Sequence, residues 1–222
     1  ISAAAYWTVG GDDPAQWPLI RAYAESLGSL ATSVAVTAPP NAIAGAPIPI
    51  NASVTSNGAP LAGVAATLRF KAAGTADFVD VSSAPTGADG AVAFAPIAAT
   101  PGDWAVFVAG ADGRAEQLSS PVTITITSAV AVTSAPKAKV KRLSTVPIAV
   151  NALPALEGQQ IVIQLSKAGN WINSGRAKAD ASGAATVELK VRKKGSYTYR
   201  AVALAQAGFL TGASAPFRIR VK

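Results

Sequence analysis

The sequence predicts an all-β protein in which two β-sandwiches follow one another behind a short strand–helix segment. Three observations predict it: a set of motifs that occurs twice, short runs in which apolar and polar side chains alternate, and turn sequences rich in Gly, Pro, Asn and Asp. About seven short strands per copy, with turns roughly every 8–12 residues, is typical of a sandwich. No amphipathic helical pattern separates the strands, which disfavours a parallel sheet.

The repeat consists of four pairs of motifs that keep their order along the chain. The pairs are residues 47–52 with 147–152, 89–92 with 182–185, 102–104 with 195–197, and 120–124 with 215–219. The offset between partners drifts between 93 and 100 residues, as loop insertions would cause. We therefore expect one sandwich in residues 33–128 and a second in residues 129–222, with a lead-in at 1–32.

Within each copy the strands are expected where the alternation is clearest. Ile48, Ile50, Ala52 and Val54 alternate with small or polar residues, which places them on one buried face. The remaining strands are predicted at 64–71, 78–82, 91–94, 104–109, 122–127, 146–152, 161–167, 185–191, 197–204 and 217–221. Trp104 lies in such a strand and is expected in the core.

The paired motifs also carry a resemblance. They are an apolar-x-apolar-Asn-Ala strand, an Asp/Ser-Gly-Ala turn, Gly-x-Trp/Tyr, and a closing Ser/Ala-Pro-x-x-Ile. With them, the two copies resemble the tandem bacterial immunoglobulin-like or fibronectin-III-like domains at the C-terminal ends of secreted proteins. The resemblance implies a spacer, adhesive or carbohydrate-proximal accessory that is extracellular or at the cell surface. It specifies the fold well and the function hardly at all.

The lead-in has a different pattern. An apolar run ends in Tyr-Trp-Thr-Val-Gly-Gly-Asp-Asp at residues 6–13, and Pro14 then opens a helical pattern that ends at Gly28. Residues 1–28 resemble the last β/α unit of a chitinase-like (family 18, spore-germination-type) glycosidase barrel. The resemblance implies that Trp7 forms the floor of a sugar subsite. The alternative is a helical linker packed on the first sandwich.

Composition excludes several kinds of catalysis. The chain contains no Cys and no His, which removes Cys–His and Ser–His–Asp nucleophile arrangements and imidazole or thiolate metal sites. The acidic barrel motif Asp-x-x-Asp-x-Asp-x-Glu does not occur, so we expect no enzyme activity and no cofactor. The chain begins at Ile1 and lacks Met, and we expect it to be a fragment, inactive even if its parent is a modular glycoside hydrolase. We expect a monomer without a membrane span.

Charge is distributed unevenly. Residues 129–222 contain fifteen basic and three acidic side chains, a net charge of +12, whereas residues 33–128 carry −3. The basic residues predicted to bind a polyanion are Lys137, Lys139, Lys141, Lys190, Arg192, Lys193, Lys194, Arg218, Arg220 and Lys222. The expected partner is a cell-wall polymer or polysaccharide. The alternative is a solvated face that protects strand edges from pairing.

Two further expectations concern aromatic rings. Single-strand nucleic acid binders interleave basic residues with exposed stacking aromatics. Tyr197, Tyr199 and Phe217 are expected in the core or at an edge, so nucleic acid fits this chain less well than a polysaccharide. Trp171 follows a Gly-Asn turn near the start of a strand and is, with Trp7, a candidate for stacking on a sugar ring.

Overall fold

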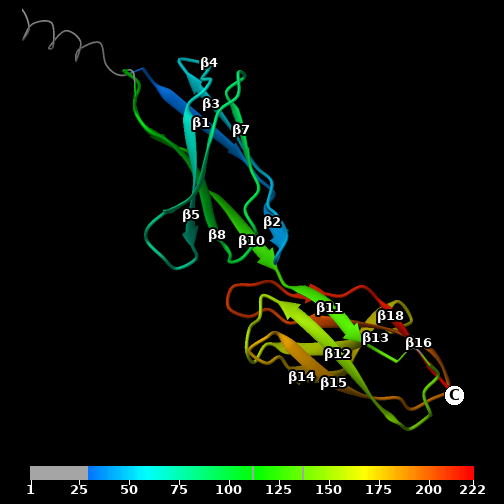
Figure 1. The fold of residues 1–222 in the computed structure, drawn as a ribbon. Helices are drawn as coiled ribbons and strands as arrows, with labels where there is room; N and C mark the ends of the chain where they lie inside the picture. The colour runs from blue at the N-terminus through cyan, green and yellow to red at the C-terminus, as the bar shows by residue number, and fades with distance from the viewer. Residues whose placement is uncertain (1–29, 112, 137) are drawn as a thin grey trace, which may run out of the picture.

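A computed structural model describes residues 30–111, 113–136 and 138–222 (Figure 1). Every regular element in these ranges is a β-strand and none is a helix. The predicted all-β class is therefore confirmed for the described residues. Residues 1–29, which contain most of the predicted strand–helix segment, are not among the described residues. Leu30 already pairs with Arg114, and the first strand begins at Thr32.

The first sandwich contains two sheets. One consists of β1 (Thr32–Thr37), β3 (Ile50–Ser56), β4 (Ala59–Pro60) and β7 (Ala91–Phe94). The other consists of β2 (Asn41–Ile43), β10 (Val122–Thr127), β8 (Gly102–Val108), β5 (Ala65–Ala72), β6 (Val79–Pro85) and β9 (Gln117–Leu118). Strand pairs are antiparallel except β2 with β10, where the chain crosses from the first sheet to the second. This arrangement is immunoglobulin-like.

The second sandwich repeats it. Its smaller sheet consists of β11 (Ala129–Ser134), β12 (Thr145–Leu153) and β15 (Ala184–Lys190). Its larger sheet consists of β14 (Asn170–Lys178), β13 (Gln160–Lys167), β16 (Gly195–Ala203), β17 (Gly212–Ala213) and β18 (Phe217–Val221). Val140 forms a parallel bridge with Val221, the counterpart of the β2–β10 pair.

Each sandwich closes over its own apolar core. Ile48, Ile50 and Val54 have no exposed surface and Ala52 is 5% exposed, so the alternation predicted for this strand is confirmed. Trp104 is 4% exposed and its ring centroid lies 4.6 Å from that of Phe70, which confirms its expected place in the core. Apolar strand faces thus supply most of both cores.

The larger sheets show that one of the four motif pairs, 102–104 with 195–197, is two residues out of register in the predicted alignment. Ala201 N donates to Ser214 Oγ, as Val106 N donates to Ser119 Oγ, so Trp104 corresponds to Tyr199 and not to Tyr197. Tyr199 is likewise buried, and its ring centroid lies 6.0 Å from that of Phe217. A slip of two residues leaves every side chain on its own face, so the alternation alone did not reveal the error.

The smaller sheets show the second slip. Val54 N donates to Gly90 O, and Ala152 N donates to Gly183 O, each at 2.9 Å. Val54 therefore corresponds to Ala152, an offset of 98 and not the predicted 100. The turn pairing of residues 89–92 with 182–185 is confirmed by the same two hydrogen bonds.

Candidate functional site

The predicted site residues divide into those that the structure describes and those that it does not. Trp7 and Lys137 lie outside the described residues. Trp171 is half-buried at the start of β14, and the guanidinium of Arg200 lies 4.3 Å from its ring centroid. One face of this ring is therefore covered by a cation.

The described basic candidates are all exposed and fall into two groups. Hydrogen bonds from Val140 N to Arg220 O and from Lys222 N to Val140 O place the segment containing Lys139 and Lys141 beside β18. The structure therefore brings the two predicted sets at 139–141 and 218–222 together.

The second group lies elsewhere. Lys190 pairs with Thr145 in the smaller sheet, and Arg192, Lys193 and Lys194 follow in the next turn. Tyr197 Oη donates to Lys194 O at 3.0 Å. Lys190, Arg192 and Lys193 border a groove of about 530 Å³ between the β13–β14 and β15–β16 turns. Burial, and to a smaller extent the neighbouring Tyr197, raise the pKa of Tyr199 at its floor.

The larger sheet of the second sandwich contains no acidic residue. Its strands carry six basic side chains, which are Lys167, Arg176, Lys178, Arg200, Arg218 and Arg220. Within the described part of this sandwich, no Lys or Arg lies within 4.0 Å of a carboxylate. This sheet therefore presents positive charge without internal neutralisation.

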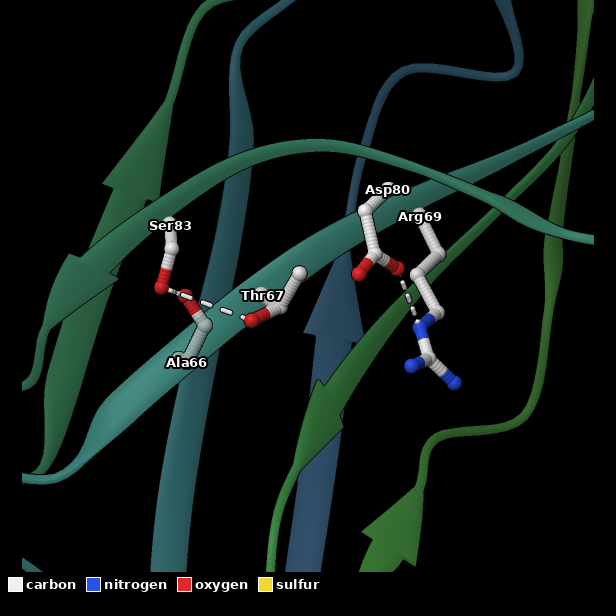
Figure 2. A network of polar contacts seen from close by, with 5 residues as sticks. All are labelled: Ala66, Thr67, Arg69, Asp80 and Ser83. Carbon is white, nitrogen blue, oxygen red and sulfur yellow. Dashed lines mark hydrogen bonds and ion pairs between the residues drawn. The ribbon is translucent and has the colours of Figure 1, made fainter.

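The corresponding sheet of the first sandwich is neutralised. Arg69 Nε donates to Asp80 Oδ1 at 2.7 Å across β5 and β6, beside a hydroxyl pair of Thr67 and Ser83 (Figure 2). Lys71 Nζ lies 3.1 Å from Asp103 Oδ2. The hydroxyl of Thr123 and then Lys71 hold the pKa of Asp103 below its usual range.

The same positions in the second sandwich are neutral. A bulge interrupts the β5–β6 pair just before Arg69, and a bulge interrupts the β13–β14 pair just before Gln164. Gln164 therefore occupies the position in the second sandwich that Arg69 occupies in the first. Asn173 then stands where Asp80 stands in the first sandwich, and Thr198 stands where Asp103 does. Both carboxylates have thus been replaced by uncharged polar groups.

These neutral groups form a line across three strands that ends on an arginine. Arg200 Nε donates to Gln164 Oε1 at 2.9 Å, and Gln164 Nε2 donates to Asn173 Oδ1 at 3.0 Å. The terminal nitrogens of Arg200 have no partner among the described residues. The line fixes the guanidinium and leaves its outer edge open.

The sequence did not identify Arg200, Gln164 or Asn173 as site residues. They lie on three strands and meet only through the register that the bulge in β14 sets. The available signal was the lack of any Asp or Glu in residues 160–178 and 195–221. The lack of acidic residues indicates that the positive charge of this sheet is not neutralised, but it does not single out Arg200.

The junction between the sandwiches is a second built feature. Only Ser128 separates β10 from β11, and its amide donates to Leu210 O while Leu210 N donates to Ile126 O. Phe209, from the loop between β16 and β17, is 5% exposed and belongs to the core of the first sandwich. A Cβ on Gly212 would lie 1.7 Å from Ser128 O, so this approach requires glycine.

A buried glutamine completes the junction. Gln159 has no exposed surface, and its Nε2 donates to Ser128 Oγ at 3.2 Å and to Leu204 O at 3.0 Å. Leu156, from the loop between β12 and β13, also packs against the first core. Side chains of the second sandwich therefore form part of the core of the first.

The described residues lack two further kinds of feature. They contain no group of three or more His, Cys, Asp or Glu side chains placed to hold a metal ion. They also contain no helix long and apolar enough to cross a membrane.

Comparisons with known proteins show likeness only among solved structures. No known protein family matches the chain, and no curated protein is significantly similar to it. The D0–D1 domain of intimin is 18% identical, with 84% of this chain and 97% of that chain covered at a TM-score of 0.32.

Two further structures are similar at the same level. A C-terminal 282-residue fragment of intimin, in complex with the intimin-binding domain of the translocated intimin receptor, is 16% identical over 85% of this chain and 64% of that chain, with a TM-score of 0.39. A tetra-tandem repeat in the extending region of a large adhesion protein is 15% identical, covering 85% and 50%, with a TM-score of 0.33. Likenesses this distant carry no function over to this chain.

Proposed function

We propose that the two sandwiches form a stiff, non-catalytic spacer in a secreted or cell-surface bacterial protein. The observation that carries the proposal is the burial of Phe209, a residue of the second sandwich, in the core of the first. Placement outside the cell rests on the resemblance of the paired motifs to secreted tandem modules.

The junction gives the physical reason for stiffness. Because Ser128 alone links β10 to β11, and Phe209 and Leu156 pack in the core of the first sandwich, the sandwiches cannot pivot without exposing apolar surface. Exposing a buried Phe costs about 1.5–3 kcal/mol. A cost of this size restricts the hinge to a small fraction of the molecules.

The test is Phe209→Ala in the full chain, followed by small-angle scattering and hydrogen exchange. We expect a broader distribution of particle dimensions and faster exchange in the first sandwich, although the substituted residue belongs to the second. The cost in stability should approach the ~3–5 kcal/mol typical of a buried Phe→Ala change. Phe217→Ala is the control, because Phe217 is partly buried against the second core and does not contact the first. A wild-type chain that already scatters as a flexible pair would overturn the proposal.

A second proposed function is contact with an anionic cell-wall polymer or polysaccharide through the basic second sandwich. The specific observation is the set of exposed, unpaired cations described above. Retention on an immobilised anionic polymer should fall steeply with salt, because exposed charges are screened beyond about 8 Å at 0.15 M ionic strength. Retention that does not change between low and high salt would contradict this function and leave the spacer proposal intact.

The glycosidase alternative stays a prediction. It depends on residues 1–28 and on Trp7, which lie outside the described residues. An Asp-x-x-Asp-x-Asp-x-Glu motif in a parent protein that contains this chain would support a barrel, whereas further sandwich copies there would favour the spacer alone.

A further inference from the structure

Two uncharged side chains, Gln164 and Trp171, fix the position of the Arg200 guanidinium. Its Nε is bonded to Gln164, and the face of its guanidinium lies over Trp171, at 4.3 Å from the ring centroid. Stacking on an aromatic ring and a fixed Nε reduce the conformational freedom that an arginine loses on binding. The two terminal nitrogens remain as a fork for a bidentate carboxylate or sulfate group.

The same sheet face carries further cationic donors on the adjacent strand. Arg218 pairs with Thr198 on the adjacent strand and Arg220 pairs with Ser196, and both arginines are exposed. Alternate residues on one face of a strand are about 7 Å apart. Cations therefore recur along the sheet at intervals that suit an extended chain of anionic groups.

We propose that this face, centred on Arg200, binds an acidic polysaccharide, with a carboxylate or sulfate of the sugar chain seated on the Arg200 guanidinium. The inference deepens, and rests on, the proposed contact with an anionic polymer. Trp171 acts as a positioning residue for Arg200 and not as the stacking platform itself.

The neutral side chains on the face favour a polysaccharide over a nucleic acid. The hydroxyls of Ser196 and Thr198 and the free amide nitrogen of Asn173 match the hydroxyl groups of sugars. Nucleic acid binders need open aromatic rings on which bases stack, and the ring on this face, Trp171, is covered by Arg200. A hollow of about 690 Å³ between β18 and residues 132–136 extends the surface beside Arg218 and Arg220.

The decisive variant is Thr198→Asp, which places a carboxylate where the first sandwich has Asp103. It should pair with the arginines and abolish binding without removing any cation. Thr198→Asn is the isosteric control and should bind as the wild type does. Arg200→Gln should lose about tenfold or more in affinity, because a charge-assisted bidentate contact disappears. Lys190→Gln removes the same charge from the opposite sheet and should lose about twofold or less.

Binding is measured by calorimetry on the full chain at two salt concentrations, with polygalacturonate as the probe and polyphosphate and single-stranded DNA as comparators. Circular dichroism melts confirm that each variant is folded. The inference is supported if the polygalacturonate affinity falls for Thr198→Asp and Arg200→Gln but not for Lys190→Gln. Equal losses for Arg200→Gln and Lys190→Gln would overturn the site and leave general polyanion attraction standing. Stronger binding of DNA or polyphosphate would overturn the ligand class, and no binding of any polymer would overturn both polyanion proposals.

Discussion

The larger sheets of the two sandwiches have the same strand order and the same bulge but opposite electrostatics. In the first, Asp80 and Asp103 neutralise Arg69 and Lys71. In the second, an uncharged side chain stands at each acidic position, and Arg200 has no acidic partner among the described residues. Exposed ion pairs contribute only about 0–1 kcal/mol each, so the fold tolerates their loss. The difference in charge between the sheets therefore costs the fold little stability.

The smaller sheets are alike where the backbone leaves no choice. Gly90 and Gly183 have φ values of +73° and +79° and occupy the same turn before β7 and β15. A Cβ would lie 2.4 Å from Val54 O in one copy and 2.3 Å from Ala152 O in the other. Sterics therefore fix these two positions, while surface charge is free to diverge.

The largest expected effect comes from substituting these glycines. Gly90→Ala and Gly183→Ala should each destabilise their own sandwich by at least about 3 kcal/mol, from left-handed backbone strain of about 1–2 kcal/mol plus the collision with a carbonyl. Gly74→Ala and Gly169→Ala are the matched controls, since both have a positive φ with nothing within 4 Å of the added Cβ. Denaturant unfolding, monitored by hydrogen exchange in each sandwich, measures the loss of unfolding free energy in each of the four variants. Equal costs in all four variants would show that the collision contributes nothing.

A smaller effect is expected when the first sandwich is made to resemble the second. Asp80→Asn with Asp103→Thr removes both carboxylates and leaves Arg69 and Lys71 unpaired on the surface. We expect a stability loss of about 1 kcal/mol or less per pair. In an Arg200→Gln background, the double change should restore part of the affinity for polygalacturonate, measured by calorimetry. Unchanged affinity would mean that unpaired Arg69 and Lys71 do not by themselves create a binding face. It would also mean that the arginine must be held against a ring, as Trp171 holds Arg200.

The sequence determined the elements whose side chains alternate clearly. Residues 91–94, 122–127 and 217–221 were predicted with the bounds that the structure has. It placed Trp171 near the start of a strand but gave no bounds for β14, because Asn170–Lys178 is an edge strand with polar groups on both faces and a bulge that interrupts its period. β2, with three residues, is too short to show a period.

The candidate site was predicted less completely for a related reason. Net charge identifies the second sandwich, because composition does not depend on register. Arg200, Gln164 and Asn173 come together only through strand pairing, and a two-residue slip such as that between Tyr197 and Tyr199 moves the partner without changing the face. The Phe209 contact was equally hidden, since a loop residue packs into the core of the neighbouring copy.

The smallest expected effect is a difference in acid sensitivity between the two larger sheets. The Thr123 hydroxyl and Lys71 lower the pKa of Asp103 in the folded chain, so its contribution to stability is present above the unfolded value of about 3.9 and is lost as the pH falls through the folded pKa. Thr198 at the corresponding position does not titrate. Asp103→Asn should therefore flatten the stability of the first sandwich between pH 5 and pH 2, measured by denaturant unfolding, while exchange in the second sandwich follows the wild-type curve. If Asp103→Asn leaves the acid dependence of the first sandwich as steep as before, the Lys71–Asp103 pair is not what distinguishes the two sheets.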